Sequence, residues 1–357
     1  MRPSHNALPS DFQVDILETG VLMSDPMTRN PMIISRTPLR VSFCGGGTDI
    51  DAFSINEPLG GRVVSIAMDQ YVYVTLNERF DNRIRVSYSS TEYADSIEEV
   101  QHDLVREAMR LTGITSGIEI TTIADIPGRG TGLGSSSSVT VGLLNAMHSF
   151  SGNNVTKERL AEEACKIEID ILGAPIGRQD QYSVAFGGAN SIMFGSEGVS
   201  VSPMELSQET IARLSSEFSL VYTGLTRSAS QVLAEKPNDP NDKLARLREI
   251  RLQADKAVDF LESGDINSIG ALLNDAWLAK RGISANISNA QIDDLYKMVM
   301  DLGANGAKLL GAGAGGFLLI HGDPELRGKM ISGLGPENRI IPLGIDFTGS
   351  TIIHVDE

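Results

Sequence analysis

Three clusters of glycine are the part of this sequence whose composition and spacing could do chemistry. They are Cys44-Gly45-Gly46-Gly47-Thr48-Asp49, Gly128-Arg129-Gly130-Thr131-Gly132-Leu133-Gly134 and Gly311-Ala312-Gly313-Ala314-Gly315-Gly316. Glycine lets the backbone approach another group closely and adopt positive φ angles. The chain has 36 glycines in 357 residues, above the usual ~7%. These clusters therefore indicate backbone segments that approach another group closely, such as a ligand or another part of the chain, or that adopt positive φ angles.

The second cluster has the features of an anion site. It lies between a predicted strand, 118–124, and a predicted helix that starts near Ser135. Such a junction directs free N–H groups and the positive end of a helix dipole outward. Ser135 to Ser138 follow the glycines and supply N-cap candidates, further donors or a Mg²⁺ ligand. The alternative is a flexible loop before a well-capped helix, which does not require four glycines and four serines.

Two common nucleotide-binding motifs do not fit. No Gly-x-x-x-x-Gly-Lys-Ser/Thr sequence occurs, which excludes a Walker-type loop. Gly311, Gly313 and Gly316 match Gly-x-Gly-x-x-Gly, but residues 317–320 are predicted as a strand where that motif must open a helix. A dinucleotide-dependent dehydrogenase is therefore rejected.

Hydrophobic periodicity predicts the elements that position these clusters, and their mixture predicts a fold of both helices and strands. Residues 1–30 are predicted to be an extension outside the fold, and a domain boundary is placed near 205. Strands are predicted over 62–67, 71–76, 83–88, 118–124, 189–194, 199–203, 217–222, 307–310, 316–321, 338–342 and 350–354. Helices are predicted over 97–111, from Ser135 to Phe150, and over 157–172, 227–235, 241–262, 266–279 and 289–302.

Composition excludes several classes of protein. The net charge of −16 disfavours nucleic acid and anionic lipid as general partners. Cys44 and Cys165 are too few for a disulfide framework, and the five histidines are too scattered for a zinc site. The sequence shows no apolar run of ~18 residues and no signal peptide pattern. We expect a cytoplasmic protein with no membrane partner.

In their order and spacing the three clusters resemble the motifs of the GHMP small-molecule kinases. Residues 38–49 (PLRVSFCGGGTD) resemble the first motif, 127–138 the Pro-x-x-x-Gly-Leu-Gly-Ser-Ser phosphate loop, and 308–316 the third motif. Residues 36–49 are most similar to the D-glycero-D-manno-heptose 7-phosphate kinase branch, and 223–230 also resemble it. Galactokinases carry Gly-Glu-His-Thr-Asp where this chain has Gly-Gly-Gly-Thr-Asp, which argues against galactose.

The resemblance implies an α+β fold of two domains. Residues 31–205 would form an ATP-binding domain like ribosomal protein S5, and residues 206–357 a ferredoxin-like domain, with the active site between them. The implied function is ATP- and Mg²⁺-dependent phosphorylation of the anomeric hydroxyl of D-glycero-D-manno-heptose 7-phosphate, giving the 1,7-bisphosphate. Alternatives are a 1-kinase for an unphosphorylated, fucose-like sugar and a catalytically silent sugar sensor. The oligomeric state stays open.

The resemblance also assigns roles to residues. Asp180, within Gly-Arg-Gln-Asp-Gln at 177–181, would be the catalytic base and Arg40 the neighbouring cation. Glu168 would hold Mg²⁺ with Ser136. The ATP phosphates would be bound by Gly130, Gly132, Leu133, Gly134, Ser135, Ser136 and Ser137. Without the family, Glu168 could be an exposed acid of a charged helix, Asp180 a turn residue and Arg40 a surface residue at a strand end.

Substrate contacts complete the expected site. Asp49 is the implied acceptor for sugar hydroxyls, Gly46 and Gly47 would let the backbone approach the sugar, and Gly313 is placed among the substrate contacts. A phosphorylated sugar needs a second anion site, for which the candidates are Arg178, Arg227, Lys280 and Arg281. Arg178 is preferred because it is two residues from Asp180.

Overall fold

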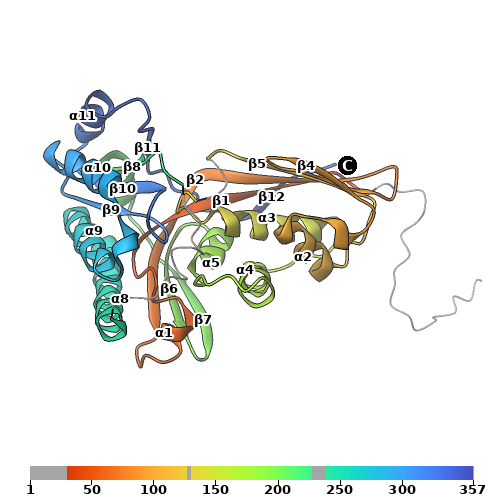
Figure 1. Ribbon diagram of the computed structural model, residues 1–357, viewed down its shortest axis with the longest axis horizontal. Coiled ribbons are helices and arrows are strands. Elements are labelled where there is room, and N and C mark those ends of the chain that lie inside the picture. Colours follow the sequence, from red (N-terminus) through yellow and green to blue (C-terminus); the bar gives the residue numbers. More distant parts are fainter. Residues whose placement is uncertain (1–29, 127–129, 227–238, 357) are drawn as a thin grey trace, which may run out of the picture. The chain divides into compact units, whose positions relative to one another are not determined.

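The structure is a computed structural model that describes residues 30–126, 130–226 and 239–356 (Figure 1). The predicted helix 227–235 and the candidate Arg227 lie outside these residues. So does almost all of the predicted extension 1–30, which stays a prediction.

An eight-stranded sheet takes up most of the first half of the chain. Its order is β12-β1-β2-β5-β3-β4, and β6 pairs with β2 and β7. The long strand β2 is buried on both faces over 63–68 and alternates between buried and half-buried positions after Gln70, so one face of the sheet is less covered there. The strands are β1 (Ile33–Cys44), β2 (Gly61–Glu78), β3 (Ile84–Ser87), β4 (Thr91–Ala94), β5 (Ile118–Ala124), β6 (Ala189–Gly195), β7 (Gly198–Pro203) and β12 (Thr351–Val355).

Helices cover one face of this sheet, and the central one carries the second glycine cluster at its start (Figure 1). It packs on β1 and β2, where a Cβ at Gly142 would lie 3.0 Å from the Thr37 hydroxyl, so glycine permits the close approach. The helices of this half are α1 (Asp51–Ser54), η1 (Ile97–Glu99), α2 (Asp103–Thr112), α3 (Ser135–Phe150), α4 (Lys157–Cys165), the π-helical segment η2 (Lys166–Ile171) and α5 (Gln179–Phe186).

The second half contains a four-stranded antiparallel sheet of order β11-β8-β10-β9. In chain order its strands run 4-1-3-2 within a β-α-β-β-α-β pattern, which is a ferredoxin-like arrangement. Helices α8 and α9 contact the large sheet, and Phe43 meets Phe218 edge-on at 5.4 Å between ring centroids. The elements are α6 (Gln208–Glu217), β8 (Phe218–Tyr222), α8 (Pro240–Ser263), α9 (Ile266–Arg281), η3 (Ala285–Ile287), α10 (Ala290–Asp301), β9 (Gly306–Leu309), β10 (Phe317–His321), α11 (Leu326–Gly333) and β11 (Ile340–Pro342).

The predicted α+β class and two-domain architecture are confirmed, with local differences. The strands predicted over 62–67 and 71–76 are one continuous strand, and the helix predicted over 97–111 divides into η1 and α2. The last strand, β12, pairs with β1 and so returns to the large sheet. The boundary near 205 falls between β7 and α6 and stays a prediction. In the described part of the chain, no helix is long and apolar enough to cross a membrane.

Candidate active site

The second glycine cluster forms the start of α3. Its N-cap is Gly134, with φ +73° and no side-chain cap, so the prediction that a serine caps the helix is wrong. Gly130 and Gly132 also have positive φ angles, 73° and 75°. The first N–H groups of α3 therefore have no capping side chain, which leaves them and the helix dipole available to an anion.

The predicted phosphate-binding residues lie together around this helix start. The Leu133 side chain is fully buried, so this residue would contact a ligand through its backbone. Ser135 and Ser137 are buried and Ser136 is exposed. The Ser138 hydroxyl donates to the Pro38 carbonyl oxygen at 2.8 Å, which fixes the helix start on β1.

Arg40 and Asp180 are brought together at the same point, although 140 residues separate them. The Arg40 Nε donates to Asp180 Oδ1 at 2.7 Å, Nη2 lies 2.6 Å from the same oxygen, and Nη1 donates to the Gly132 carbonyl oxygen at 2.6 Å. A Cβ at Gly134 would lie 3.2 Å from Arg40 Cγ and 3.4 Å from Asp180 Cγ, so glycine lets the phosphate loop close over the pair. The Arg40 side chain is 4% exposed and that of Asp180 is 23% exposed. A turn residue or a surface arginine would not be paired in this way.

Glu168 is a buried carboxylate within η2, not an exposed acid of a charged helix. Its oxygens accept hydrogen bonds from Ser136 at 2.7 Å, Ser137 at 2.8 Å and the Gln181 amide at 2.6 Å. Burial raises the pKa of Glu168, and Asp180 adds to that shift, while the three hydrogen bonds oppose it. Short π-helical segments often occur at functional sites, and this one turns Glu168 toward the start of α3.

The donors around Glu168 fit a magnesium ion of the kind that binds between protein and nucleotide. Mg²⁺ prefers oxygen ligands and in phosphotransferases uses one or two protein groups together with phosphate oxygens. The buried Glu168 carboxylate and the exposed Ser136 hydroxyl are such groups. Within the described residues no cluster of three or more His, Cys, Asp or Glu could hold a metal ion.

Asp49, at the end of the first glycine cluster, lies under the start of α5. It accepts hydrogen bonds from the Gly47 N–H at 2.9 Å and from the Gln179 N–H at 3.1 Å, and the Gln179 side chain donates to both its oxygens. A Cβ at Gly177 would lie 1.9 Å from Asp49 Oδ2, so only glycine fits there. Burial raises the pKa of Asp49, opposed by the Gln179 hydrogen bond, and nearby Asp180 raises it further.

Of the two glycines expected beside the sugar, only Gly47 has a backbone conformation that favours glycine. Gly47 has a φ of +97°, whereas a Cβ at Gly46 would meet the Gln179 side chain at an ordinary 3.6 Å. Both flank the Asp49 carboxylate and the start of α5. Their contact with a sugar stays a prediction.

The described basic candidates for a second anion site have different partners in the structure. Arg178, two residues before Asp180 in the chain, pairs with Asp51 at 2.6 Å, with 29% of its side chain exposed. Arg281 pairs with Asp293 at 2.7 Å, and its guanidinium lies 5.7 Å from the centre of the Trp277 ring. Lys280 reaches the Gly311 carbonyl oxygen and faces Arg40 and Asp180.

The third glycine cluster packs against the second. A Cβ at Gly311 would lie 2.4 Å from Gly132 Cα, and one at Gly316 would lie 2.2 Å from the Thr131 carbonyl oxygen. These glycines therefore let the ferredoxin-like domain meet the phosphate loop backbone to backbone. Gly313 has a φ of +123°, and a Cβ there would lie 2.8 Å from the Ile287 carbonyl oxygen. Backbone conformation and packing therefore explain why this residue is glycine. Its predicted contact with substrate stays a prediction.

Three residues of the site were missed by sequence reasoning. Gln179 donates a hydrogen bond to Asp49, and Gln181 donates one to Glu168. Both are next to Asp180 in the sequence, and that position could have identified them as site residues. Lys308 is 4% exposed and donates to the carbonyl oxygens of Ser42 at 2.8 Å and Phe43 at 2.7 Å. Its place in the predicted strand 307–310, at the start of the third motif, was the available signal.

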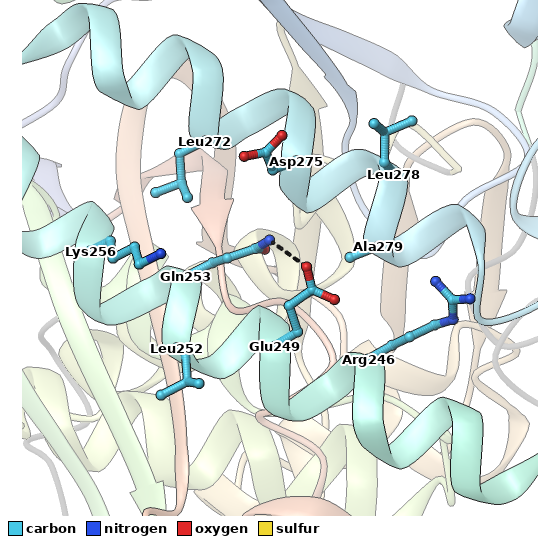
Figure 2. Close-up of a pocket in the computed structure, with 9 residues that line it drawn as sticks. All are labelled: Arg246, Glu249, Leu252, Gln253, Lys256, Leu272, Asp275, Leu278 and Ala279. Carbon is cyan, nitrogen blue, oxygen red and sulfur yellow. Dashed lines mark hydrogen bonds between the residues drawn. The ribbon is translucent and has the colours of Figure 1, made fainter.

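A hollow lies between α8 and α9 (Figure 2). Inside it the Gln253 amide donates to Glu249 at 3.4 Å. Its lining contains none of the residues predicted for the site, so it does not enter the chemistry described above. The lining residues are Arg246, Glu249, Leu252, Gln253, Lys256, Leu272, Asp275, Leu278 and Ala279.

Comparisons with known proteins match both halves of the chain. The model of the GHMP kinases N terminal domain matches residues 98–188, and the model of the GHMP kinases C terminal domain matches residues 257–334. The chain is 29% identical to D-glycero-alpha-D-manno-heptose 7-phosphate kinase of Campylobacter jejuni over 323 residues, which cover 85% of this chain and 94% of that protein.

Two further relatives bear on fold and on substrate. A bifunctional fucokinase/GDP-fucose pyrophosphorylase of Arabidopsis thaliana is 26% identical over 317 residues, or 79% of this chain but 29% of that longer protein. The crystal structure of a D-glycero-D-manno-heptose 1-phosphate kinase from Bacteroides thetaiotaomicron matches with a TM-score of 0.75 at 23% identity, over 91% of this chain and 100% of the other. That likeness shows a shared fold.

Proposed function

The chain belongs to the GHMP kinase family, and on that premise we propose that it transfers the terminal phosphoryl group of ATP to the anomeric hydroxyl of D-glycero-D-manno-heptose 7-phosphate. The products are the 1,7-bisphosphate and ADP. One observation carries the proposal: the Asp180 carboxylate, paired with Arg40 at 2.6–2.7 Å, lies where the phosphate loop starts α3. A nucleophilic hydroxyl beside Asp180 therefore has a proton acceptor and an anion-binding helix start on either side of it.

In this reaction Asp180 accepts the proton of the sugar hydroxyl as its oxygen bonds to the γ-phosphorus. The bond between that phosphorus and the bridging oxygen breaks, and ADP leaves with the electron pair. Positioning and charge stabilisation supply most of the catalysis in such transfers. The uncapped N–H groups of α3 would bind phosphate oxygens, and Arg40 would offset charge on the transferred group while it orients Asp180.

Glu168 and Ser136 would hold the Mg²⁺ that accompanies ATP, which supplies charge neutralisation to the phosphates. Gln181 and Ser137 orient the Glu168 carboxylate through hydrogen bonds of 2.6 Å and 2.8 Å. Asp49, fixed by Gln179 and Gly47, would accept hydrogen bonds from sugar hydroxyls. Each of these groups is held by a second one, as preorganised sites require.

The substrate assignment has two supports. The relative that carries this activity in its name aligns over 85% of the chain. Arg178 lies two residues from Asp180 and is 29% exposed, so a guanidinium is available for the distant phosphate of the sugar. Asp51 already pairs with Arg178, and a sugar phosphate would compete with that carboxylate or share the guanidinium with it.

The test is ADP release measured with heptose 7-phosphate, the unphosphorylated heptose, L-fucose and galactose. We expect the highest kcat/KM for heptose 7-phosphate. Equal or higher kcat/KM for an unphosphorylated sugar would instead support a fucose-like 1-kinase. L-Fucose is in the panel because a fucokinase is among the relatives of this chain. Sugar binding without ADP release in any reaction would indicate a sensor.

A further inference from the structure

Lys280 is a basic residue that the ferredoxin-like domain places at the phosphate loop. It stands at the end of α9, and its Nζ donates to the carbonyl oxygen of Gly311. Gly311 in turn lies against Gly132, whose carbonyl oxygen accepts a hydrogen bond from Arg40 at 2.6 Å. Lys280 and Arg40 therefore flank one backbone contact from opposite domains.

Four charged groups on other elements act electrostatically on Lys280. They are the cations Arg40 on β1 and Lys308 on β9, and the carboxylates Asp49 after β1 and Asp180 on α5. An ammonium group has three N–H donors, and the structure shows one of them in use, on Gly311. Lys280 therefore has donors available for oxygen atoms of a ligand at Asp180.

We propose that Lys280 binds the terminal phosphoryl group of ATP and takes up a proton from solvent when that group arrives. This inference rests on the proposed function for its ATP half and is independent of which sugar is the acceptor. Lys280 then acts beside Arg40 as a second cation of the reacting centre, contributed by the other domain. The only bond formed in this step is the N–H bond of the ammonium.

The position of Lys280 favours ATP over the distant phosphate of the sugar. Its Nζ contacts the glycine that packs on the phosphate loop, and it faces Asp180, where the bond to phosphorus would form. Arg178 instead donates to Asp51 at 2.6 Å, and 29% of its side chain is exposed. The two basic residues therefore serve different phosphates.

The uptake of a proton follows from the charges around the amine. Burial, together with the charges of Lys308 and Arg40, lowers the pKa of Lys280 to about 7, although Asp49 and Asp180 oppose the shift. A polyanion next to the amine favours its charged form and so raises that pKa. Above pH 7 the free protein holds Lys280 mainly neutral, so binding draws in a proton and weakens as the pH rises.

The experiment is calorimetric titration with the Mg²⁺ complex of a non-hydrolysable ATP analogue, in two buffers of different ionisation enthalpy at pH 8. Wild type and Lys280→Arg are compared, because arginine keeps the charge but does not titrate. A pKa of about 7 leaves roughly nine tenths of the amine neutral at pH 8. We expect wild type to take up about nine tenths of a proton more than Lys280→Arg. Protonation of the analogue itself is common to both proteins and cancels.

Lys280→Met gives a second readout, with Lys297→Met as the control at an exposed lysine paired with Asp301. Loss of one charge-assisted hydrogen bond should weaken analogue binding roughly ten- to a hundredfold in Lys280→Met, and the control should bind like wild type. Equal proton uptake in wild type and Lys280→Arg would overturn the proposal, as would unweakened binding by a folded Lys280→Met.

The outcomes also separate this inference from the proposed function. The titration contains no sugar, so a wrong sugar assignment leaves its result standing. Wild type that fails to bind the analogue at all would contradict the proposed kinase activity itself. A rise in KM for the phosphorylated sugar alone in Lys280→Met would assign Lys280 to the sugar phosphate and overturn the inference.

Discussion

Replacing Asp180 by Asn removes the proposed proton acceptor and keeps the shape of the side chain. Loss of a general base lowers the rate about 10²–10⁴-fold, which corresponds to roughly 3–5.5 kcal/mol of transition-state free energy. The amide oxygen still accepts a hydrogen bond from Arg40, and Arg40 keeps the Gly132 carbonyl oxygen. We therefore expect a stability loss of about 1–3 kcal/mol, below the cost of a fully unpaired buried cation.

The assay for Asp180→Asn is coupled ADP release with sugar at saturating ATP, together with analogue binding and a thermal melt. We expect kcat to fall by the stated factor while affinity for the ATP analogue changes little. Asp170→Asn, at an exposed position of η2, is the matched control and should retain wild-type kcat. Turnover of Asp180→Asn within about threefold of wild type would show that Asp180 holds Arg40 in place and is not the base.

The remaining predictions concern metal, packing and substrate. Glu168→Gln should raise the Mg²⁺ concentration for half-maximal rate, with Ser136→Ala acting in the same direction more weakly, and an unchanged Mg²⁺ titration would place the metal elsewhere. Gly311→Ala should lower the melting temperature, because its Cβ would lie 2.4 Å from Gly132 Cα at a φ of +71°, whereas Gly328→Ala in open space should not. Arg178→Ala should raise KM for heptose 7-phosphate roughly ten- to a hundredfold and leave KM for ATP unchanged, and Arg281→Ala should change neither.

The sequence predicts the elements of this fold better than the contacts between them. Apolar residues at helical spacing over many residues locate α3, α8 and α9, although α3 is buried on most of its sides. Helix α5, which carries Asp180, was missed, since Gln179–Phe186 is short and is buried on several sides. The polar pair Asp69-Gln70 interrupts the apolar pattern, so the sequence predicts two strands. In the structure both residues lie within one continuous strand, β2, where Asp69 is exposed and Gln70 is half-buried.

The site shows the same division. The three glycine clusters were recognised as backbone that approaches something closely, but what each approaches depends on residues far away in the chain. Gly311 meets Gly132, and Gly177 meets Asp49, across long sequence separations that local patterns do not encode. The serine predicted to cap α3 is replaced by Gly134, and two of the serines turn to Glu168 instead.

The central claim is tested most directly by phosphorus NMR of the reaction of this protein with heptose 7-phosphate and MgATP. The account predicts one new phosphate ester at the anomeric carbon for each ADP formed, with the 7-phosphate signal retained and with Asp180→Asn forming this product about 10²–10⁴-fold more slowly. An ester at another hydroxyl would contradict the account, as would ATP hydrolysis to inorganic phosphate with the sugar unchanged.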